Sequence, residues 1–95
     1  MFTHAVLFKI NKSELKKYYR DNKMWARHAK KAKGFISYYT MKRADFKDQY
    51  ASVYSWRDKK YHDKFMGKFH DWLVSKSYAK VKVLGYYNFN SQQHF

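Results

Sequence analysis

The chain has 95 residues, which is enough for one small domain and too little for two separate hydrophobic cores. It carries 21 Lys and Arg against 7 Asp and Glu, a formal net charge of +14, and its 45% hydrophobic content excludes a disordered chain. The absence of Cys excludes disulfides, a thiolate nucleophile and Cys-based zinc or iron–sulfur sites.

Residues 2–10 are predicted to form the first strand. Both alternating sets of side chains are largely apolar, so the strand should be covered on both sides. Its longest uninterrupted apolar run, residues 5–8, is far shorter than the roughly 20 residues of a membrane span. No basic leader of the kind that begins a signal peptide is present. We therefore expect a cytoplasmic protein with no membrane span.

Residues 12–31 are predicted to form a long amphipathic helix. Asn11 and Glu14 have the spacing of an N-terminal capping box, and Gly34 is suited to the turn after the helix end. Aromatic and small residues, Trp25 among them, cluster on one side at helical spacing, and the opposite side is basic. The basic face of this predicted helix comprises Lys16, Arg20, Lys23, Arg27 and Lys30.

A β-hairpin is predicted next, with strands at residues 35–43 and 49–56 that are rich in aromatic and β-branched side chains. Asp58 can cap a second helix, in which large apolar side chains such as Phe65 recur at helical spacing. Residues 81–90 resume an extended aromatic pattern and are predicted to form the fourth strand.

These elements follow the order β-α-β-β-α-β, the ferredoxin-like α+β arrangement of a four-stranded antiparallel sheet with two helices on one face. We expect one domain over residues 1–90 and a C-terminal tail over residues 91–95. Two helices cover only one face of such a sheet, yet the predicted strands carry large side chains on both faces. The free face either meets a second sheet in a homodimer or forms an aromatic platform for a flat partner such as a base. We predict the homodimer.

The order of landmarks resembles the dimeric α+β barrel superfamily, and within it the antibiotic biosynthesis monooxygenase-like domains. The landmarks are Trp25 late in the first helix, Gly34 and Phe35 opening the second strand, and Trp56 ending the third. Residues 61–71 are similar to an uncharacterised branch whose second helix carries Phe-Met, a short gap and His-Asp. The resemblance implies two sheets facing each other in a barrel. Members include cofactor-independent oxygenases, haem-degrading enzymes and proteins of unknown role.

For an oxygenase, the resemblance implies a small, electron-rich aromatic substrate that reduces O2 itself. No cofactor is then needed, and the protein supplies a base and a dry pocket. The haem-degrading members use an Asn on the first strand, a Trp on the second helix and a His further along. The matching positions here hold Val6, Phe65 and Ser75, so haem degradation by that route is not expected.

Five histidines could supply a base or a metal ligand: His4, His28, His62, His70 and His94. No two of them are four residues apart, the helical spacing that aims two imidazoles at one ion, and we predict no metal site. His70 lies beside Asp71 at the edge of the predicted apolar stripe and is the first candidate for a general base. His4 is the second. A structural hydrogen-bonding role is the alternative for both.

Four aromatic side chains are predicted to border a ligand pocket between the sheet and the helices: Trp25, Tyr39, Trp56 and Phe65. The alternative is that these rings only form the core, as aromatic residues at helical spacing usually do. A small aromatic molecule is the ligand that such a pocket would take.

The basic face supports a competing interpretation as a nucleic-acid-binding module. Its side chains could bind phosphates or an anionic membrane surface, and nucleic-acid binding would be weak, independent of sequence and sensitive to salt. RNA-recognition domains share the ferredoxin-like order and stack bases on aromatic sheet residues. Tyr50 and Tyr54 are the rings available here, but the third strand lacks the motif's Gly and has Ser52 at the second ring position. A solvated basic surface is the simplest alternative.

Overall fold

A computed structural model describes residues 1–95. The elements follow one another as β1 (Phe2–Lys9), the short 3-10 turn η1 (Lys12–Glu14), α1 (Leu15–Lys30), β2 (Phe35–Lys42), β3 (Gln49–Trp56), α2 (Lys59–Lys76) and β4 (Lys82–Asn90). The predicted element order and the ferredoxin-like α+β class are confirmed. Neither α1 nor α2 has the length and hydropathy that crossing a membrane requires.

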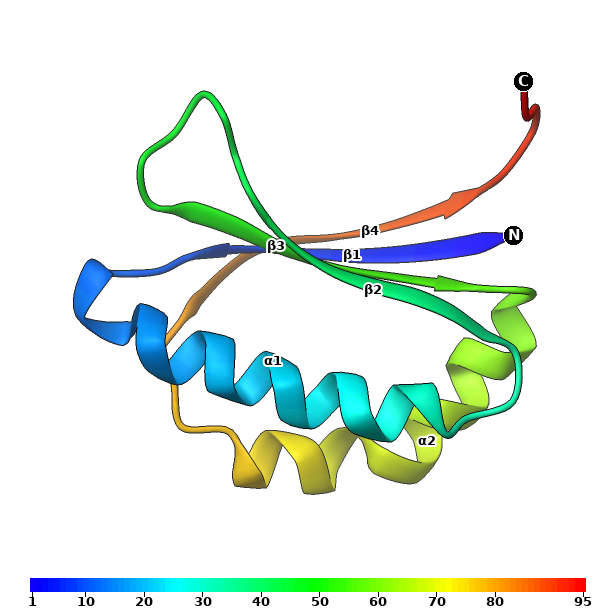
Figure 1. The fold of residues 1–95 in the computed structure, drawn as a ribbon, viewed down its shortest axis with the longest axis horizontal. Coiled ribbons are helices and arrows are strands. Elements are labelled where there is room, and N and C mark those ends of the chain that lie inside the picture. The colour runs from blue at the N-terminus through cyan, green and yellow to red at the C-terminus, as the bar shows by residue number, and fades with distance from the viewer.

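The four strands form one antiparallel sheet in the order β2-β3-β1-β4, so β1 lies in its interior and β4 forms one edge. Both helices lie on the same side of this sheet (Figure 1). β1 pairs with β3 along its whole length, from Phe2 opposite Trp56 to Lys9 opposite Gln49. Because successive strand residues point to opposite faces, this register decides which side chains lie under the helices.

The start of the first helix differs from the sequence prediction. Asn11 precedes η1, but its side chain makes no capping hydrogen bond. The Glu14 carboxylate, expected to complete a capping box, instead accepts a hydrogen bond of 2.8 Å from the backbone N–H of Lys80. A tertiary partner has replaced the local one. The cap of α2 is as predicted, since the Asp58 side chain accepts a hydrogen bond of 3.3 Å from the backbone N–H of Lys60.

The main core lies between the sheet and the two helices. Trp56 at the end of β3 and Leu73 on α2 are fully buried, and the Phe65 ring packs against Trp56 with centroids 5.3 Å apart. Burying a side chain of this kind contributes roughly 1.5–3 kcal/mol. A smaller buried cluster, built on Ile10 and Tyr18, lies near the other end of β1. The space between the two clusters is where the candidate site lies.

Gly34 makes the turn between α1 and β2. Its φ is 84°, in the left-handed region that residues with a side chain rarely adopt. A Cβ at this position would lie 2.2 Å from the ring of Tyr61 on α2. The Gly34 carbonyl also accepts a hydrogen bond of 2.8 Å from the backbone N–H of Arg57. Both the backbone conformation and the packing therefore require glycine here.

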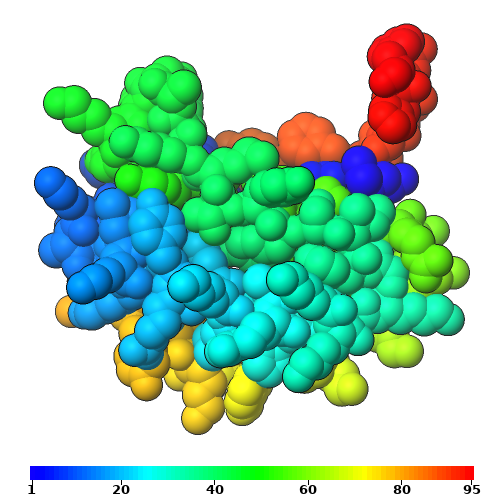
Figure 2. Space-filling model, viewed as in Figure 1, coloured from blue at the N-terminus to red at the C-terminus, as the bar shows by residue number.

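The sheet face away from the helices, called here the open face, is uncovered. Two rows of paired residues cross it, Tyr87-Ala5-Val53-Tyr39 and Gly85-Leu7-Ala51-Met41. None of these side chains is charged, and Tyr39 is 57% exposed. The β2–β3 loop and the C-terminal end of the chain rise on either side of this face and leave a hollow between them (Figures 1 and 2).

Candidate functional site

A cavity of about 430 Å³ lies between the sheet and the helices. Side chains from all four strands form its floor, and α1 and α2 form its roof. One side is closed by residues 77–81, called here the connector, which join α2 to β4. Most of the lining side chains are hydrophobic. A space of this size and character fits a small, mainly apolar molecule.

The strand register assembles the cavity floor. Two rows of paired residues build it, Asn88-His4-Tyr54-Tyr38 and Tyr86-Val6-Ser52-Thr40. Asn88 and Thr40 stand at the two sheet edges outside the cavity, and each hydrogen-bonds to a lining residue, His4 and Asn22 respectively. The floor therefore has an imidazole near one edge and hydroxyl groups toward the other.

Three hydroxyl groups form a cluster in the cavity wall, called here the hydroxyl cluster. Tyr38 donates a hydrogen bond of 3.0 Å to Ser52 Oγ, and the Tyr18 and Ser52 hydroxyls are 2.8 Å apart. Two hydrogen bonds among three hydroxyl groups leave one hydrogen free to donate. Burial raises the pKa of both Tyr18 and Tyr38, so both remain neutral near pH 7. This wall suits a ligand that presents an acceptor oxygen.

His4 lies in the floor and is 8% exposed. Its Nδ1 is 2.7 Å from Asn88 Oδ1, the only hydrogen bond that the ring makes within the protein. The His62 ring packs against it, with centroids 4.5 Å apart. Burial, and secondarily the charge that His4 can carry, lower the pKa of His62 to about 4. His62 is therefore neutral at physiological pH.

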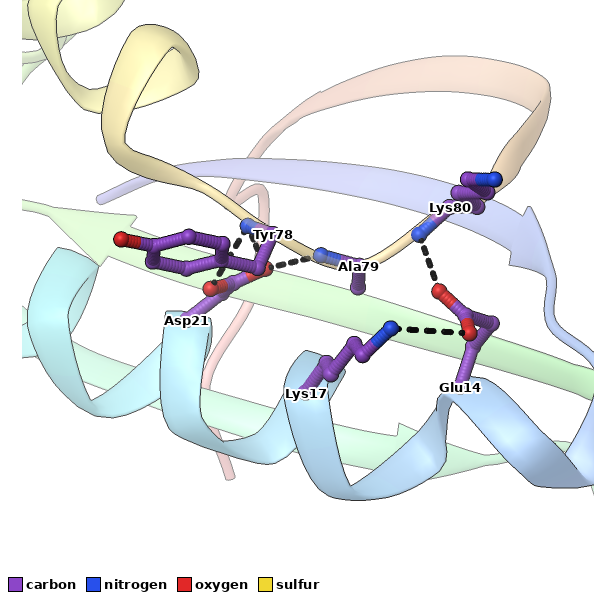
Figure 3. Close-up of polar contacts among 6 residues, drawn as sticks. All are labelled: Glu14, Lys17, Asp21, Tyr78, Ala79 and Lys80. Atoms are coloured by element: carbon purple, nitrogen blue, oxygen red, sulfur yellow. Dashed lines mark hydrogen bonds and ion pairs between the residues drawn. The ribbon is translucent and has the colours of Figure 1, made fainter.

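Two carboxylates hold the connector in place beside the cavity (Figure 3). Asp21, buried on α1, accepts hydrogen bonds of 2.9 and 2.8 Å from the backbone N–H groups of Tyr78 and Ala79. Glu14 does the same for the next N–H, and this hydrogen bond lowers the pKa of Glu14. Arg20 stacks over the Tyr78 ring at 4.1 Å. The two carboxylates therefore supply the hydrogen-bond acceptors that the backbone N–H groups of the connector would otherwise find in a helix or a strand.

The roof brings two predicted site residues together. Trp25 lines the cavity and donates a hydrogen bond of 3.0 Å from Nε1 to Ser77 Oγ on the connector. His70 also lines the cavity, with its ring 6.1 Å from that of Trp25. The His70 side chain is 47% exposed, and its Nδ1 is 3.1 Å from Asp71 Oδ1. The structure thus places Trp25, His70 and His4 around one cavity.

The other three predicted pocket residues lie outside this cavity. Trp56 and Phe65 are buried in the main core beside it. Tyr39 lies on the open face, and its neighbour Tyr38 occupies the cavity wall, because adjacent strand residues point in opposite directions.

Sequence reasoning missed three features of the site. They are the hydroxyl cluster, the pair of hydrogen bonds by which Asp21 holds Tyr78 and Ala79, called here the Asp21 clamp, and the hydrogen bond between Asn88 and His4. One signal for Asp21 was present, since helical spacing places it on the same side of α1 as Tyr18 and Trp25. No comparable signal marks Asn88, because its importance depends on β4 pairing with β1 in one register.

The basic face lies on α1, and all five of its residues are exposed. None of the five forms an ion pair with an acidic side chain. Tyr50 and Tyr54 point under the helices and are 5% and 7% exposed, so neither ring is available to stack on a base. Recognition of RNA through those two rings is therefore incompatible with this fold.

The three positions that align with the catalytic residues of the haem-degrading members differ in character and surroundings. Val6 lies in the cavity floor and Phe65 in the core. Ser75 is exposed on α2 and donates its hydroxyl hydrogen to the carbonyl of Trp72. These residues do not fit haem degradation by that route. The structure also contains no group of three or more His, Cys, Asp or Glu side chains arranged to hold a metal ion.

Neither a known protein family nor a curated protein matches the sequence. Solved structures do share the fold. SnoaB, a cofactor-independent oxygenase from Streptomyces nogalater, has a TM-score of 0.77 at 12% identity over 98% of this chain and 94% of that chain. A MhuD mutant with two manganese protoporphyrin IX molecules bound per active site has a TM-score of 0.79 at 9% identity over 100% and 98%.

A protein from Nitrosomonas europaea, provisionally assigned as an antibiotic biosynthesis monooxygenase, has a TM-score of 0.74 at 9% identity over 98% of this chain and 100% of that chain. Identities this low show the fold alone. At that level the predicted resemblance is confirmed, because the chain has the α+β fold of antibiotic biosynthesis monooxygenase-like domains.

Proposed function

We propose that this protein, which has an antibiotic biosynthesis monooxygenase-like fold, binds a small flat aromatic molecule and oxidises it without a cofactor. The observation that carries the proposal is a mainly apolar cavity of about 430 Å³ with two imidazoles, His4 and His70, in its wall. The apolar lining limits the contact of a reactive ligand with water, and an imidazole can take a proton from the ligand. The shared fold with SnoaB, a cofactor-independent oxygenase, supports this choice.

In such a reaction the ligand supplies the electrons. A base removes a proton from the electron-rich aromatic, and the resulting anion reduces O2. One oxygen atom enters the product and the other leaves as water, so no external reductant is consumed. The protein binds and orients the ligand, accepts the proton and excludes water. The free hydrogen of the hydroxyl cluster can orient a ligand oxygen, and Trp25 supplies apolar surface above the floor.

We also propose that the chain forms a homodimer through the open face. Two rows of uncharged residues, with exposed rings such as Tyr39 and Tyr87, form a surface that is unfavourable in water. A second copy can cover it with the same surface across a two-fold axis. Because the helices lie on the other side of the sheet, each cavity then remains within its own subunit.

Dithranol, an electron-rich anthrone, is a suitable first substrate for testing the proposed activity. The protein should accelerate O2 uptake, and labelled O2 should place one labelled atom in the product. Val6→Phe enlarges a floor residue and should abolish binding and turnover. Ile36→Phe makes a similar change at an exposed position of β2 and should change neither. A folded wild-type protein that neither binds nor oxidises electron-rich aromatics would overturn the proposal.

A second candidate function is the binding of nucleic-acid phosphates by the basic face. Its five cations have no acidic partner, and the one acidic residue within that stretch of α1, Asp21, is buried against the connector. Open-face dimerisation would leave one basic face on each outer side of the dimer. Binding of this kind depends on counterion release and is independent of base sequence.

A further inference from the structure

We propose that His4, held in one tautomer by Asn88, is the group that accepts the ligand's proton, and that the ligand carries an ionisable O–H group. The inference rests on the proposed function and names the proton acceptor and the ligand group for the same cavity. Asn88 is a positioning residue, since it does not line the cavity and acts through His4.

One hydrogen bond determines where the hydrogen of neutral His4 lies. Nδ1 is 2.7 Å from Asn88 Oδ1, and a carbonyl oxygen can only accept a hydrogen bond. Nδ1 therefore carries the hydrogen and donates it. The electron pair that can take a further proton is then on Nε2.

Nε2 is also the ring nitrogen that a ligand can reach. His4 lines the cavity, and its ring makes no second hydrogen bond within the protein. The buried nitrogens without a partner belong to Trp56 and His62, and His4 Nε2 is not among them. An unpaired nitrogen that is accessible from an apolar cavity favours a ligand hydrogen-bond donor at that point.

Three titratable groups pack against the His4 ring. They are His62 from α2, Tyr54 from β3 and Tyr86 from β4. Burial lowers the pKa of His62 to about 4 and raises that of Tyr54, so both stay neutral around pH 7. A protonated His4 therefore lies beside a neutral His62 and is not repelled by a second positive charge.

The proton transfer is balanced without any further reactant. The O–H bond of the ligand breaks, an Nε2–H bond forms, and the ligand becomes an anion beside the imidazolium of His4. The Nδ1–H group donates to Asn88 before and after the transfer, so this hydrogen bond orients the ring in both states.

His70, the other imidazole of the cavity, is less suited to this role. Its side chain is 47% exposed, and its Nδ1 already contacts the exposed carboxylate of Asp71 at 3.1 Å. Water reaches this position and would screen the charges that proton transfer creates. The buried histidine is therefore the better acceptor, although sequence reasoning ranked His70 first.

Two matched probes test the inference, para-nitrophenol and its methyl ether para-nitroanisole, because only the first has an ionisable O–H. With the wild-type protein we expect the phenol to bind as its coloured anion at a pH where it is mostly neutral in solution. The ether should bind about tenfold more weakly, as expected for loss of one charge-assisted hydrogen bond.

Variants of Asn88 separate positioning from general structure. Asn88→Ala should weaken binding of the phenol about tenfold and leave the ether unchanged, because only the phenol uses Nε2. Asn88→Asp restores an acceptor and should rescue binding. Asn90→Ala removes another Asn of β4, opposite Phe2, and is the matched control. Nitrogen-15 NMR should show an unprotonated Nε2 in the wild type and both tautomers in Asn88→Ala.

The outcomes separate this inference from the proposed function. Two results would overturn the inference. One is a wild-type His4 whose ring hydrogen is on Nε2, and the other is that the wild type and Asn88→Ala each bind the phenol and the ether equally well. The proposed binding of aromatic molecules in the cavity would still stand. Failure of both probes and of dithranol to bind would overturn the proposed function and the proton transfer together, and the NMR result would still decide whether Asn88 sets the tautomer.

Discussion

The imidazole rings of His4 and His62 pack against each other with centroids 4.5 Å apart, and each residue is 8% exposed. In the folded protein the pKa of His62 is lowered from 6.5 to about 4, chiefly by burial. The unfolded chain therefore binds a proton at this residue at a higher pH than the folded chain does. By linkage, the free energy of unfolding falls as the pH drops from about 6.5 to about 4.

We predict that this loss is on the order of 3 kcal/mol, since the pKa falls from 6.5 to about 4 and one pKa unit corresponds to about 1.4 kcal/mol. His62→Phe should flatten this part of the stability profile, because it keeps ring packing against Phe2 and Trp56 and removes the titration. Urea unfolding at a series of pH values measures the effect. His94→Phe, in the exposed tail, is the control and should keep the wild-type slope. A wild-type profile that is flat over this range would contradict the prediction.

The Asp21 clamp should contribute strongly to stability. Asp21→Ala leaves the backbone N–H groups of Tyr78 and Ala79 without their acceptor, and we expect it to lower the free energy of unfolding by about 2–3 kcal/mol. Asp21→Asn keeps one acceptor oxygen and should lose less. Hydrogen exchange of these two amides should accelerate in the Ala variant. Asp71→Ala, at an exposed carboxylate, is the control, and equal losses at both positions would argue against a specific clamp.

Substitution by Ala should change the stability of the fold in opposite directions at two glycines. Gly34→Ala combines a φ of 84° with a Cβ placed 2.2 Å from the Tyr61 ring, and should destabilise the fold by more than about 1 kcal/mol. Gly67→Ala adds a Cβ with no neighbour inside 4 Å and should stabilise α2 by about 0.5–1 kcal/mol. Thermal unfolding of both variants provides the comparison. A neutral Gly34→Ala would mean that the turn adapts more easily than its geometry indicates.

Dimerisation through the open face is tested by Val53→Lys. A two-fold axis would bring two copies of the new lysine close together among two rows of uncharged side chains, and the dimer should dissociate. Light scattering should report half the wild-type mass, with an unchanged circular dichroism spectrum. Ser75→Lys adds the same charge on the exposed side of α2 and should remain dimeric. A monomeric wild-type protein would contradict the proposed homodimer.

Nucleic-acid binding, where it occurs, should follow the basic face. The double variant Lys23→Glu with Arg27→Glu should weaken binding of a labelled oligonucleotide and reduce the slope of log affinity against log salt by roughly 0.7–0.9 per lost phosphate contact. Lys42→Glu with Lys47→Glu makes the same charge change at the end of β2 and in the β2–β3 loop, and should have the smaller effect. Fluorescence polarisation at several salt concentrations measures both. Equal effects of the two double variants would assign binding to net charge alone.

Much of the fold could be predicted because its signals are local. β3 has the predicted bounds, Gln49–Trp56, since its aromatic and β-branched residues lie between turn-forming stretches. Asp58 caps α2 because a short acceptor side chain directly precedes the helical repeat. Glu14 shows the limit of such rules. Its carboxylate accepts a hydrogen bond from the backbone N–H of Lys80 on the connector, and it does not complete the predicted capping box with Asn11.

The cavity was less predictable because register and distant contacts select its residues. Tyr38 and Tyr39 are adjacent rings on a strand with large side chains on both faces, so no polarity pattern shows which one points inward. Pairing with Tyr54 decides it. The partners of Asp21 are backbone N–H groups 57 and 58 residues further along the chain, which have no side-chain signature. His4 was identified as a candidate, but its partner Asn88 lies 84 residues away.

The interior position of β1 has a consequence for the nascent chain. β1 is the first strand to be synthesised, yet one of its two neighbours, β4, is the last. Until β4 emerges, β1 is an edge strand with unpaired backbone groups, and such edges readily pair with other chains. Pairing across so long a sequence separation is also slow. The growing chain therefore exposes unpaired backbone groups of β1 until β4 is available, and the cavity is complete only after β4 has docked.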